Sequence, residues 1–337
     1  MLRKHKIIFN LVLLLIVSAC SPRVPNTVVP TGTLPATLTP GPIPVPLNTS
    51  LPTGTPVPTV TIVTPVGGGL GRIVFYSNRD DGYNYIYTLT VDGSDLTRLT
   101  QGQTNYFSGP FSPDGSRLLF TGFGLTHSYT GMMNSDGSDQ VNLTNTSSSD
   151  DAFPAWLPDG SQIVFTSRRD GNNEIYKMKT DGSDLIRLTN NLKDDFAPNC
   201  SPDGRQLVFV SDRDNPTGIY SIYIMNSDGS KVRRLTNDQG NDYTPAWSPD
   251  GSQIIFRSVQ NGQSDIYRVN IDGSGMVDLT NNPAEDWSPV WSPDGSQIAF
   301  QSNRTGNWEI YLMKIDGTDL LNLTNNQADD QSPYWSK

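Results

Sequence analysis

The stretch Pro289-Val290-Trp291-Ser292-Pro293-Asp294-Gly295-Ser296-Gln297-Ile298-Ala299-Phe300 decides the fold of this chain. It predicts a strand, a tight turn and a second strand, because apolar residues suited to a pleated surface flank Ser-Pro-Asp-Gly. Proline presets one φ angle of the turn, aspartate bonds the local backbone, and glycine tolerates positive φ. The same pattern surrounds Pro113, Pro158, Pro202 and Pro249. The stretch is therefore one copy of a repeated hairpin.

Further landmarks recur with this hairpin and define the repeat. The aromatic residue that ends the second strand recurs at spacings of 45, 45, 44, 47 and 44 residues, at Phe75, Phe120, Phe165, Phe209, Phe256 and Phe300. An Ile-Tyr pair, an Asp-Gly turn and a Leu-Thr pair follow it, as at Ile310-Tyr311, Asp316-Gly317 and Leu323-Thr324. Each repeat is therefore predicted to hold four short strands joined by hairpins, which is typical of a propeller blade.

The two ends of the repeat region predict how the ring closes. The first unit starts at Gly71-Arg72-Ile73, already in its second strand, and the last is followed by an extra first strand at 332–336. Moving that strand onto the first unit completes six blades and leaves no frayed sheet edge. The predicted fold is an all-β, six-bladed β-propeller of four-stranded blades, closed by pairing of the C-terminal strand with the first blade.

Composition excludes one class of partner. The 337 residues carry a net charge of −10, and residues 70–337 hold all 34 acidic and 20 of the 24 basic residues, a net charge of −14. A nucleic-acid-binding domain would show a basic patch, so no nucleic-acid partner is expected. We expect the propeller to be monomeric.

Residues 1–19 are interpreted as a lipoprotein signal peptide. Arg3, Lys4 and Lys6 precede an apolar run from Ile7 to Val17, which is too short to span a bilayer core of about 30 Å. Val-Ser-Ala-Cys resembles the lipobox of bacterial lipoproteins, which makes Cys20 the predicted lipidation site. Ordinary secretory cleavage at this point is the alternative.

Residues 20–69 are interpreted as the lipidated cysteine followed by a disordered stalk. Positions 21–69 contain 12 Pro, 11 Thr and no acidic residue, a composition that cannot build a core. The stalk would hold the propeller away from a membrane, or would be a passive linker. The chain is accordingly expected to lie outside the cytoplasm, anchored to the bacterial membrane at the cell surface or in the periplasm.

The repeat resembles that of TolB-like propellers, a family of WD-repeat-like modules. The resemblance rests on Trp-Ser-Pro-Asp-Gly-Ser-Gln-Ile-x-Phe followed by Ser-Asn-Arg, Glu-Ile-Tyr, Asp-Gly and Leu-Thr-Asn-Asn, and it covers residues 70–337. It implies a six-bladed ring, in agreement with the count of repeats.

One carboxylate recurs seven residues before the turn proline and is the first candidate for a site. It is predicted to precede the strand that lines the central channel, at Asp151, Asp195, Asp242, Asp286 and Asp330. The arginines Arg79, Arg169, Arg213 and Arg304 would pair with these carboxylates as salt bridges between blades. Alternatively, the five carboxylates bind Ca²⁺ or a cationic group such as a lysine side chain, although the chain has no calcium-loop motif. No other cofactor is expected.

Aromatic residues near these carboxylates are the second candidate. The position after the aspartate holds Phe196, Tyr243 and Trp287 in three units, and Trp308 falls in a predicted loop. If they are exposed, such rings suit peptide or sugar contacts. The alternative is that they pack between blades.

The predicted function is a non-catalytic binding or scaffold module for a protein or peptide of the cell envelope. Residues 20–337 contain a single histidine, His127, and neither a nucleophile elbow nor a zinc or phosphate-binding motif. The alternative function is a carbohydrate-active enzyme, a glycosidase or lyase, that uses the carboxylates at the channel mouth.

Overall fold

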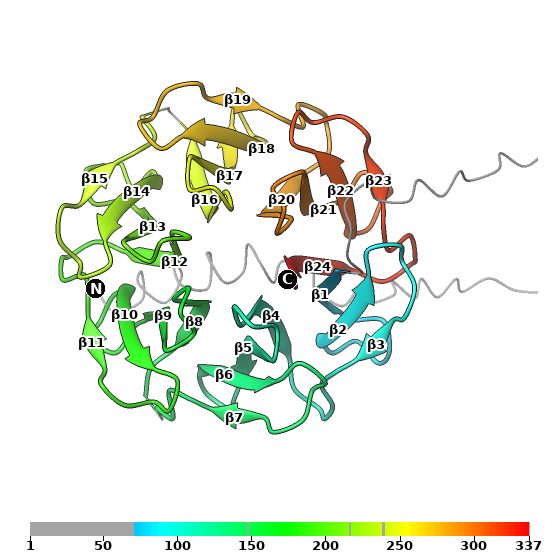
Figure 1. Ribbon diagram of the computed structural model, residues 1–337, viewed down its shortest axis with the longest axis horizontal. Coiled ribbons are helices and arrows are strands. Elements are labelled where there is room, and N and C mark those ends of the chain that lie inside the picture. Colours follow the sequence, from blue (N-terminus) through cyan, green and yellow to red (C-terminus); the bar gives the residue numbers. More distant parts are fainter. Residues whose placement is uncertain (1–70, 147, 216, 238–239, 337) are drawn as a thin grey trace, which may run out of the picture. The chain divides into compact units, whose positions relative to one another are not determined.

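Antiparallel four-stranded sheets arranged around a central axis build the described part of this computed structural model (Figure 1). The structure describes residues 71–146, 148–215, 217–237 and 240–336, which belong to one compact unit. Blade 1 has the strand order β24-β1-β2-β3, and blades 2 to 6 follow in chain order from β4–β7 to β20–β23. The prediction of six blades closed by the C-terminal strand is confirmed.

The strands share one pattern, three of six to eight residues and an outer one of only two. In chain order they are β1 (Arg72–Ser77), β2 (Tyr85–Thr90), β3 (Thr97–Arg98), β4 (Tyr106–Phe111), β5 (Arg117–Phe123), β6 (Ser128–Asn134), β7 (Val141–Asn142), β8 (Asp151–Trp156), β9 (Gln162–Ser167), β10 (Glu174–Lys179), β11 (Ile186–Arg187), β12 (Asp195–Cys200), β13 (Gln206–Ser211), β14 (Ser221–Asn226), β15 (Arg233–Arg234), β16 (Asn241–Trp247), β17 (Gln253–Gln260), β18 (Gln263–Asn270), β19 (Val277–Asp278), β20 (Asp286–Trp291), β21 (Gln297–Ser302), β22 (Glu309–Lys314), β23 (Leu321–Asn322) and β24 (Asp330–Trp335).

The outer strand is short because, just beyond it, a threonine hydroxyl accepts the backbone N–H of the third strand that a longer outer strand would bond through its carbonyl. In blade 6 the backbone N–H of Ile310 donates to Thr324 Oγ1 at 3.0 Å, and the N–H of Leu323 donates to the Ile310 carbonyl at 2.8 Å. The Leu-Thr pair recognised in the sequence therefore ends each blade rather than lying within its fourth strand. The same threonine bond occurs in all six blades.

The Ser-Pro-Asp-Gly turn forms as its chemistry predicts. Asp294 Oδ1 accepts the backbone N–H of Ser296 at 3.0 Å and the hydroxyl of Ser292 at 2.6 Å. Gly295 has a φ of 73°, in the left-handed region that other residues rarely adopt. These turns and the Asp-Gly turns lie at one end of the strands, which we call the turn face (for example 112–116 and 135–138). The loops that join second to third strands, and one blade to the next, lie at the opposite end, the loop face (for example 124–127 and 188–194).

A repeated pair of phenylalanine and tyrosine forms the core of five blades. Phe300 is fully buried, and its ring centroid lies 5.9 Å from that of Tyr311 on the neighbouring strand. The guanidinium of Arg304 covers both rings, with Cζ 5.5 and 4.8 Å from the two centroids. Blades 1, 3 and 4 repeat this stack of phenylalanine, tyrosine and arginine.

Blade 2 replaces this stack with a different packing. Gly131 stands where the other blades have tyrosine, and a Cβ there would lie only 2.3 Å from Phe120 Cζ. The ring of Tyr106, which replaces the repeated aspartate, packs edge-on to Phe120 at 5.8 Å between centroids, and the ring of Tyr129 also packs edge-on to Phe120, at 6.1 Å. An aromatic cluster therefore occupies the space that an ion pair fills elsewhere.

The ring closes through β24. It pairs antiparallel with β1, with Trp335 opposite Ile73 and Asp330 opposite Ser77. The backbone N–H of Ser336 donates to the Arg72 carbonyl at 2.8 Å, which extends the pairing beyond the strand.

No helix among the described residues is long and apolar enough to cross a membrane. The predicted signal peptide, the Cys20 lipidation site and the stalk all lie outside the described residues.

Candidate functional site: the carboxylates and aromatic residues of the loop face

The predicted carboxylates lie at the loop-face ends of the innermost strands. Asp151, Asp195, Asp286 and Asp330 open their strands rather than preceding them, and Asp242 is the second residue of β16. All five have 0% of their surface exposed. Successive residues of a strand point to opposite sides, so each aspartate turns into its own blade while the next residue turns away from it.

Four of these carboxylates form ion pairs with the predicted arginines. Arg304 Nη2 lies 2.9 and 3.1 Å from the two carboxylate oxygens of Asp286, and Arg304 Nε donates to Ser302 Oγ at 2.8 Å. The equivalent pairs are Arg79–Asp330, Arg169–Asp151 and Arg213–Asp195, at 2.7, 3.2 and 2.7 Å. Each pair lies within one blade, because the aspartate opens the innermost strand and the arginine follows the end of the adjacent second strand of the same sheet. The predicted position of these salt bridges between blades is therefore wrong.

Blade 5 departs from the pattern. Gln260 stands where the pairing arginine occurs in other blades, and Thr236 Oγ1 donates to Asp242 Oδ2 at 2.5 Å.

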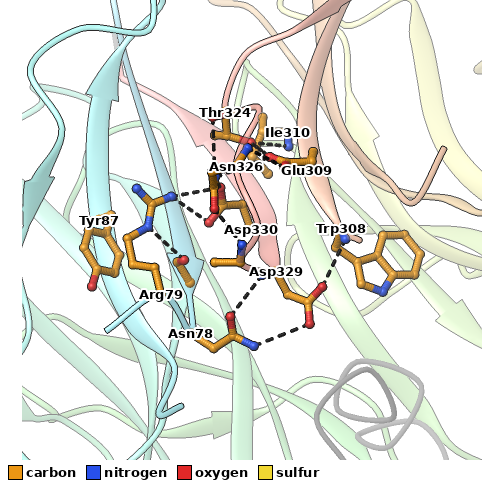
Figure 2. A network of polar contacts seen from close by, with 12 residues as sticks. Asn78, Arg79, Tyr87, Trp308, Glu309, Ile310, Thr324, Asn326, Asp329 and Asp330 are labelled. Atoms are coloured by element: carbon orange, nitrogen blue, oxygen red, sulfur yellow. Dashed lines mark hydrogen bonds and ion pairs between the residues drawn. The ribbon is translucent and has the colours of Figure 1, made fainter. Parts of the chain in front are cut away.

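At five blade boundaries a polar contact between blades comes from the residue before the repeated aspartate or, in blade 2, before Tyr106. Figure 2 shows this arrangement where blade 6 meets blade 1. Asp329 Oδ1 accepts the backbone N–H of Trp308 from blade 6 at 3.0 Å. The side-chain amide Nδ2 of Asn78, in blade 1, donates to Asp329 Oδ2 at 3.4 Å. Asp330 meanwhile accepts from Arg79 and, at 2.6 Å, from Asn326 Nδ2. Of the two adjacent carboxylates, Asp329 therefore links two blades, and Asp330 forms the ion pair within one blade.

The same contact between blades recurs around the ring. The side-chain oxygens that accept a backbone N–H from the preceding blade belong to Asn105, Asp150, Asp194, Asn241 and Asp329.

Burial sets the protonation behaviour of this region. The pKa of Asp195 is raised by its burial, against the lowering effect of the Arg213 guanidinium. Burial likewise raises the pKa of Asp194, and the neighbouring Asp212 carboxylate adds to the effect. A carboxylate enclosed in this way and bonded to arginine holds the blade together. Ligand binding by these residues stays a prediction.

The aromatic candidates do not lie where exposed contact residues would. Trp287 and Trp308 are both only 8% exposed, and their ring centroids lie 4.6 Å apart. Phe196 is also buried, while Tyr243 is partly exposed. Of the two alternatives, exposed contact or packing, the structure shows packing for both tryptophans: they lie against each other, and Arg257 of blade 5 covers Trp287.

The rings of Phe196 and Trp287 contact the neighbouring blades. Phe196 of blade 4 packs against Phe153 of blade 3 and Tyr243 of blade 5, at 6.3 and 6.5 Å between centroids. Trp287 of blade 6 packs under the guanidinium of Arg257 from blade 5, whose Cζ lies 4.1 Å from the ring centroid.

Sequence reasoning missed Arg257. A usable signal was present, since this residue follows the repeated phenylalanine of blade 5 and the equivalent positions are uncharged: Tyr76, Thr121, Thr166, Val210 and Gln301.

Among the residues that the structure describes, no group of three or more His, Cys, Asp or Glu side chains is placed to hold a metal ion. Calcium binding at the five aspartates stays a prediction.

Known proteins share both the repeat and the ring. The model of the TolB beta propeller domain family matches residues 110–216 and 190–289, together more than half of the chain. A TolB homologue of Chlorobium luteolum is 42% identical over 52 residues, which is 15% of this chain and 12% of that protein's length.

Solved structures agree on the fold. TolB from Acinetobacter baumannii has a TM-score of 0.67 and 22% identity, over 79% of this chain and 66% of that one. An oligogalacturonate lyase from Vibrio parahaemolyticus has a TM-score of 0.52 and 17% identity, over 74% and 73% of the two chains. Such low identities show the ring architecture alone. Because the family model spans most of the repeats, this chain belongs to the TolB β-propeller domain family.

Proposed function

We propose that this chain is a non-catalytic binding or scaffold module for a protein or peptide of the cell envelope. Residues 1–19 would direct export, and lipid on Cys20 would hold the propeller, as a monomer, at the outer side of the membrane. The basic and apolar pattern of residues 1–19 and the membership in a TolB propeller family support this location.

The observation that carries the proposal is the burial of the five repeated aspartates. A glycosidase or lyase needs an acid and a base within reach of its substrate. The five side chains that were the candidates for this role are enclosed, and four of them are bonded to arginine. This favours a binding role for the loop face over the alternative of a carbohydrate-active enzyme.

The loop face also presents apolar side chains suited to a protein partner. Leu125, in the loop between β5 and β6, and Leu192, between β11 and β12, are almost completely exposed, and Tyr83 is partly exposed. Burial of such side chains in an interface contributes about 25 cal/mol per Å² of apolar surface. The loop face is therefore the proposed docking side.

Crosslinking and capture from an envelope fraction test this proposal, with the full chain as bait. We expect a defined protein that is captured by the natural chain and lost when Leu125 and Leu192 are both replaced by serine. The matched control replaces Leu185 and Leu320, two half-exposed leucines near the blade edges, by serine and retains capture.

A panel of glycans supplies the opposite outcome. Turnover of a glycan by the natural chain that disappears in Asp286→Asn would replace the binding proposal with the enzyme. Capture that both leucine pairs leave unchanged would remove the loop face from the proposal.

A further inference from the structure

Arg257 is the one buried arginine among the described residues, and its position differs from that of the arginines that pair with aspartate. It lies on β17 directly opposite Tyr243, whereas Asp242 lies opposite Ser258. Since successive residues of a strand point to opposite sides, Arg257 shares a side with Tyr243 and not with Asp242. It is therefore no displaced copy of the arginines that pair with aspartate in the other blades.

The environment of Arg257 contains rings and one hydroxyl. The residue is only 7% exposed, its Nε donates to Ser264 Oγ at 2.6 Å, and its Cζ lies 4.1 Å from the Trp287 centroid and 5.0 Å from that of Tyr243. Within residues 71–146, 148–215, 217–237 and 240–336, no carboxylate lies within ion-pair distance of it. The nearby Glu285 instead accepts a hydrogen bond from Trp287 Nε1 at 3.2 Å.

The two Nη atoms are the unused part of this side chain. Neither atom makes a hydrogen bond to a described residue. Neither atom is completely buried. Each therefore keeps a small solvent-accessible surface, although the residue as a whole is 7% exposed. A guanidinium presents these two atoms as a planar fork that matches a carboxylate.

A buried cation without an anionic partner is costly to a fold. Burial lowers the pKa of Arg257 to about 10, so the group is still charged at neutral pH. The Tyr243 and Trp287 rings offset part of this cost through cation–π attraction. What remains is a positive charge between blades 5 and 6, packed against the Tyr243 and Trp287 rings, with two Nη atoms to which no described residue is hydrogen-bonded.

We infer that Arg257 is the anchor of a site that binds a carboxylate of a peptide, with Trp287 and Tyr243 holding the guanidinium in place. The carboxylate is either a chain terminus or an acidic side chain. This inference rests on the proposed function, since it names the chemical group through which a protein or peptide partner is recognised.

The test is a titration of the full chain with three acetylated tripeptides. One is Ala-Ala-Ala with a free C-terminal carboxylate, the second is its C-terminal amide, and the third is Ala-Glu-Ala amide. The readout is the indole N–H resonance of Trp287, together with calorimetry. We expect at least one carboxylate peptide to bind and to shift this resonance, while Ala-Ala-Ala amide does not. The better of the two acids identifies the source of the carboxylate.

Two substitutions separate recognition from folding. Arg257→Met keeps the apolar stem and is expected to weaken binding about tenfold or more, with a melting temperature that is unchanged or raised. Arg205→Met removes the same charge from an exposed position on the turn face, where the side chain is 85% exposed, and should leave binding unchanged.

The inference is overturned if the acid and the amide bind equally, or if Arg257→Met binds the acid with its original affinity. These outcomes are distinct from a failure of the proposed function. Capture of an envelope protein that persists in Arg257→Met would leave the proposed function standing and would remove only the carboxylate site.

Discussion

At the scale of single residues, one combination explains why the same residue types recur in most blades. Arg304 pairs with Asp286 and covers the Phe300 and Tyr311 rings, so one guanidinium compensates a buried charge and completes an aromatic core. Removing one partner of a buried pair leaves the other charge uncompensated, which is far more costly than never having had the pair. Recurrence of these residues therefore reflects the fold.

Arg304→Gln is accordingly expected to lower the free energy of unfolding by about 3–5 kcal/mol. The matched control Arg205→Gln changes an arginine whose side chain is 85% exposed, and it should stay within about 0.5 kcal/mol of the natural chain. Urea denaturation measures both. Equal effects of the two substitutions would show that the buried pair contributes no more than a surface charge.

At the scale of elements, the tight turns depend on ionised aspartates. The turn-face aspartates have a pKa below the ordinary value because serine or threonine donors, and in Asp203 the Arg205 backbone, bond the charged form; they are Asp92, Asp114, Asp136, Asp159, Asp181, Asp203, Asp228, Asp250, Asp272, Asp294 and Asp316. The pKa falls to about 2 for Asp92 and Asp114. Because the folded value lies below the unfolded one, this stabilisation is present above about pH 4 and is lost as the pH falls toward 2.

The melting temperature should therefore fall steeply between about pH 4 and pH 2. Buried carboxylates whose pKa is raised, such as Asp194, Asp195, Asp265 and Glu309, act in the opposite direction but are fewer. Replacing the five Ser-Pro-Asp-Gly or equivalent aspartates (114, 159, 203, 250 and 294) by asparagine keeps an acceptor oxygen and removes the titration. Calorimetry of this variant should show a shallower loss, and an unchanged slope would assign acid sensitivity to other groups.

At the scale of the whole molecule, stability depends on pairing β1 with β24, two strands that are more than 250 residues apart in the chain. Without β24, the β1 edge loses its ladder, and Arg79 loses the Asp330 carboxylate at 2.7 Å. Asn78 also loses its contact with Asp329, which links blade 1 to blade 6 (Figure 2). Each innermost strand contacts the next around the ring, so a loss at this seam affects every blade.

Deletion of residues 329–337 is therefore expected to lower the melting temperature of the entire propeller in one transition. Hydrogen exchange should report loss of protection in all blades, including blades 3 and 4 opposite the seam. A synthetic peptide covering residues 326–337, added in trans, should restore part of the protection. A truncated chain that melts like the intact one would refute closure by β24 as the source of cooperativity.

Local chemistry explains how much of this could be predicted. Turn residues, strand alternation and the overhanging strand at 332–336 act over a few neighbouring residues, so they predicted six blades and their closure. The two-residue length of β23 escaped prediction, because the Thr324 side chain replaces a backbone bond that the pattern alone assigns to a longer strand. In blade 2, the replacement of an ion pair by the rings around Phe120 likewise became visible only in the tertiary structure.

The sequence by itself determined the all-β class, the blade count, the turns and which arginines compensate which kind of carboxylate. Only the tertiary structure decided that those pairs lie within a blade, that Trp287 and Trp308 are covered, and that Arg257 lies between two blades with two Nη atoms to which no described residue is hydrogen-bonded. The physical reason is the distance along the chain between the residues that interact. Turn and strand preferences arise within one repeat, whereas burial at a seam depends on side chains that ring closure brings together from different repeats.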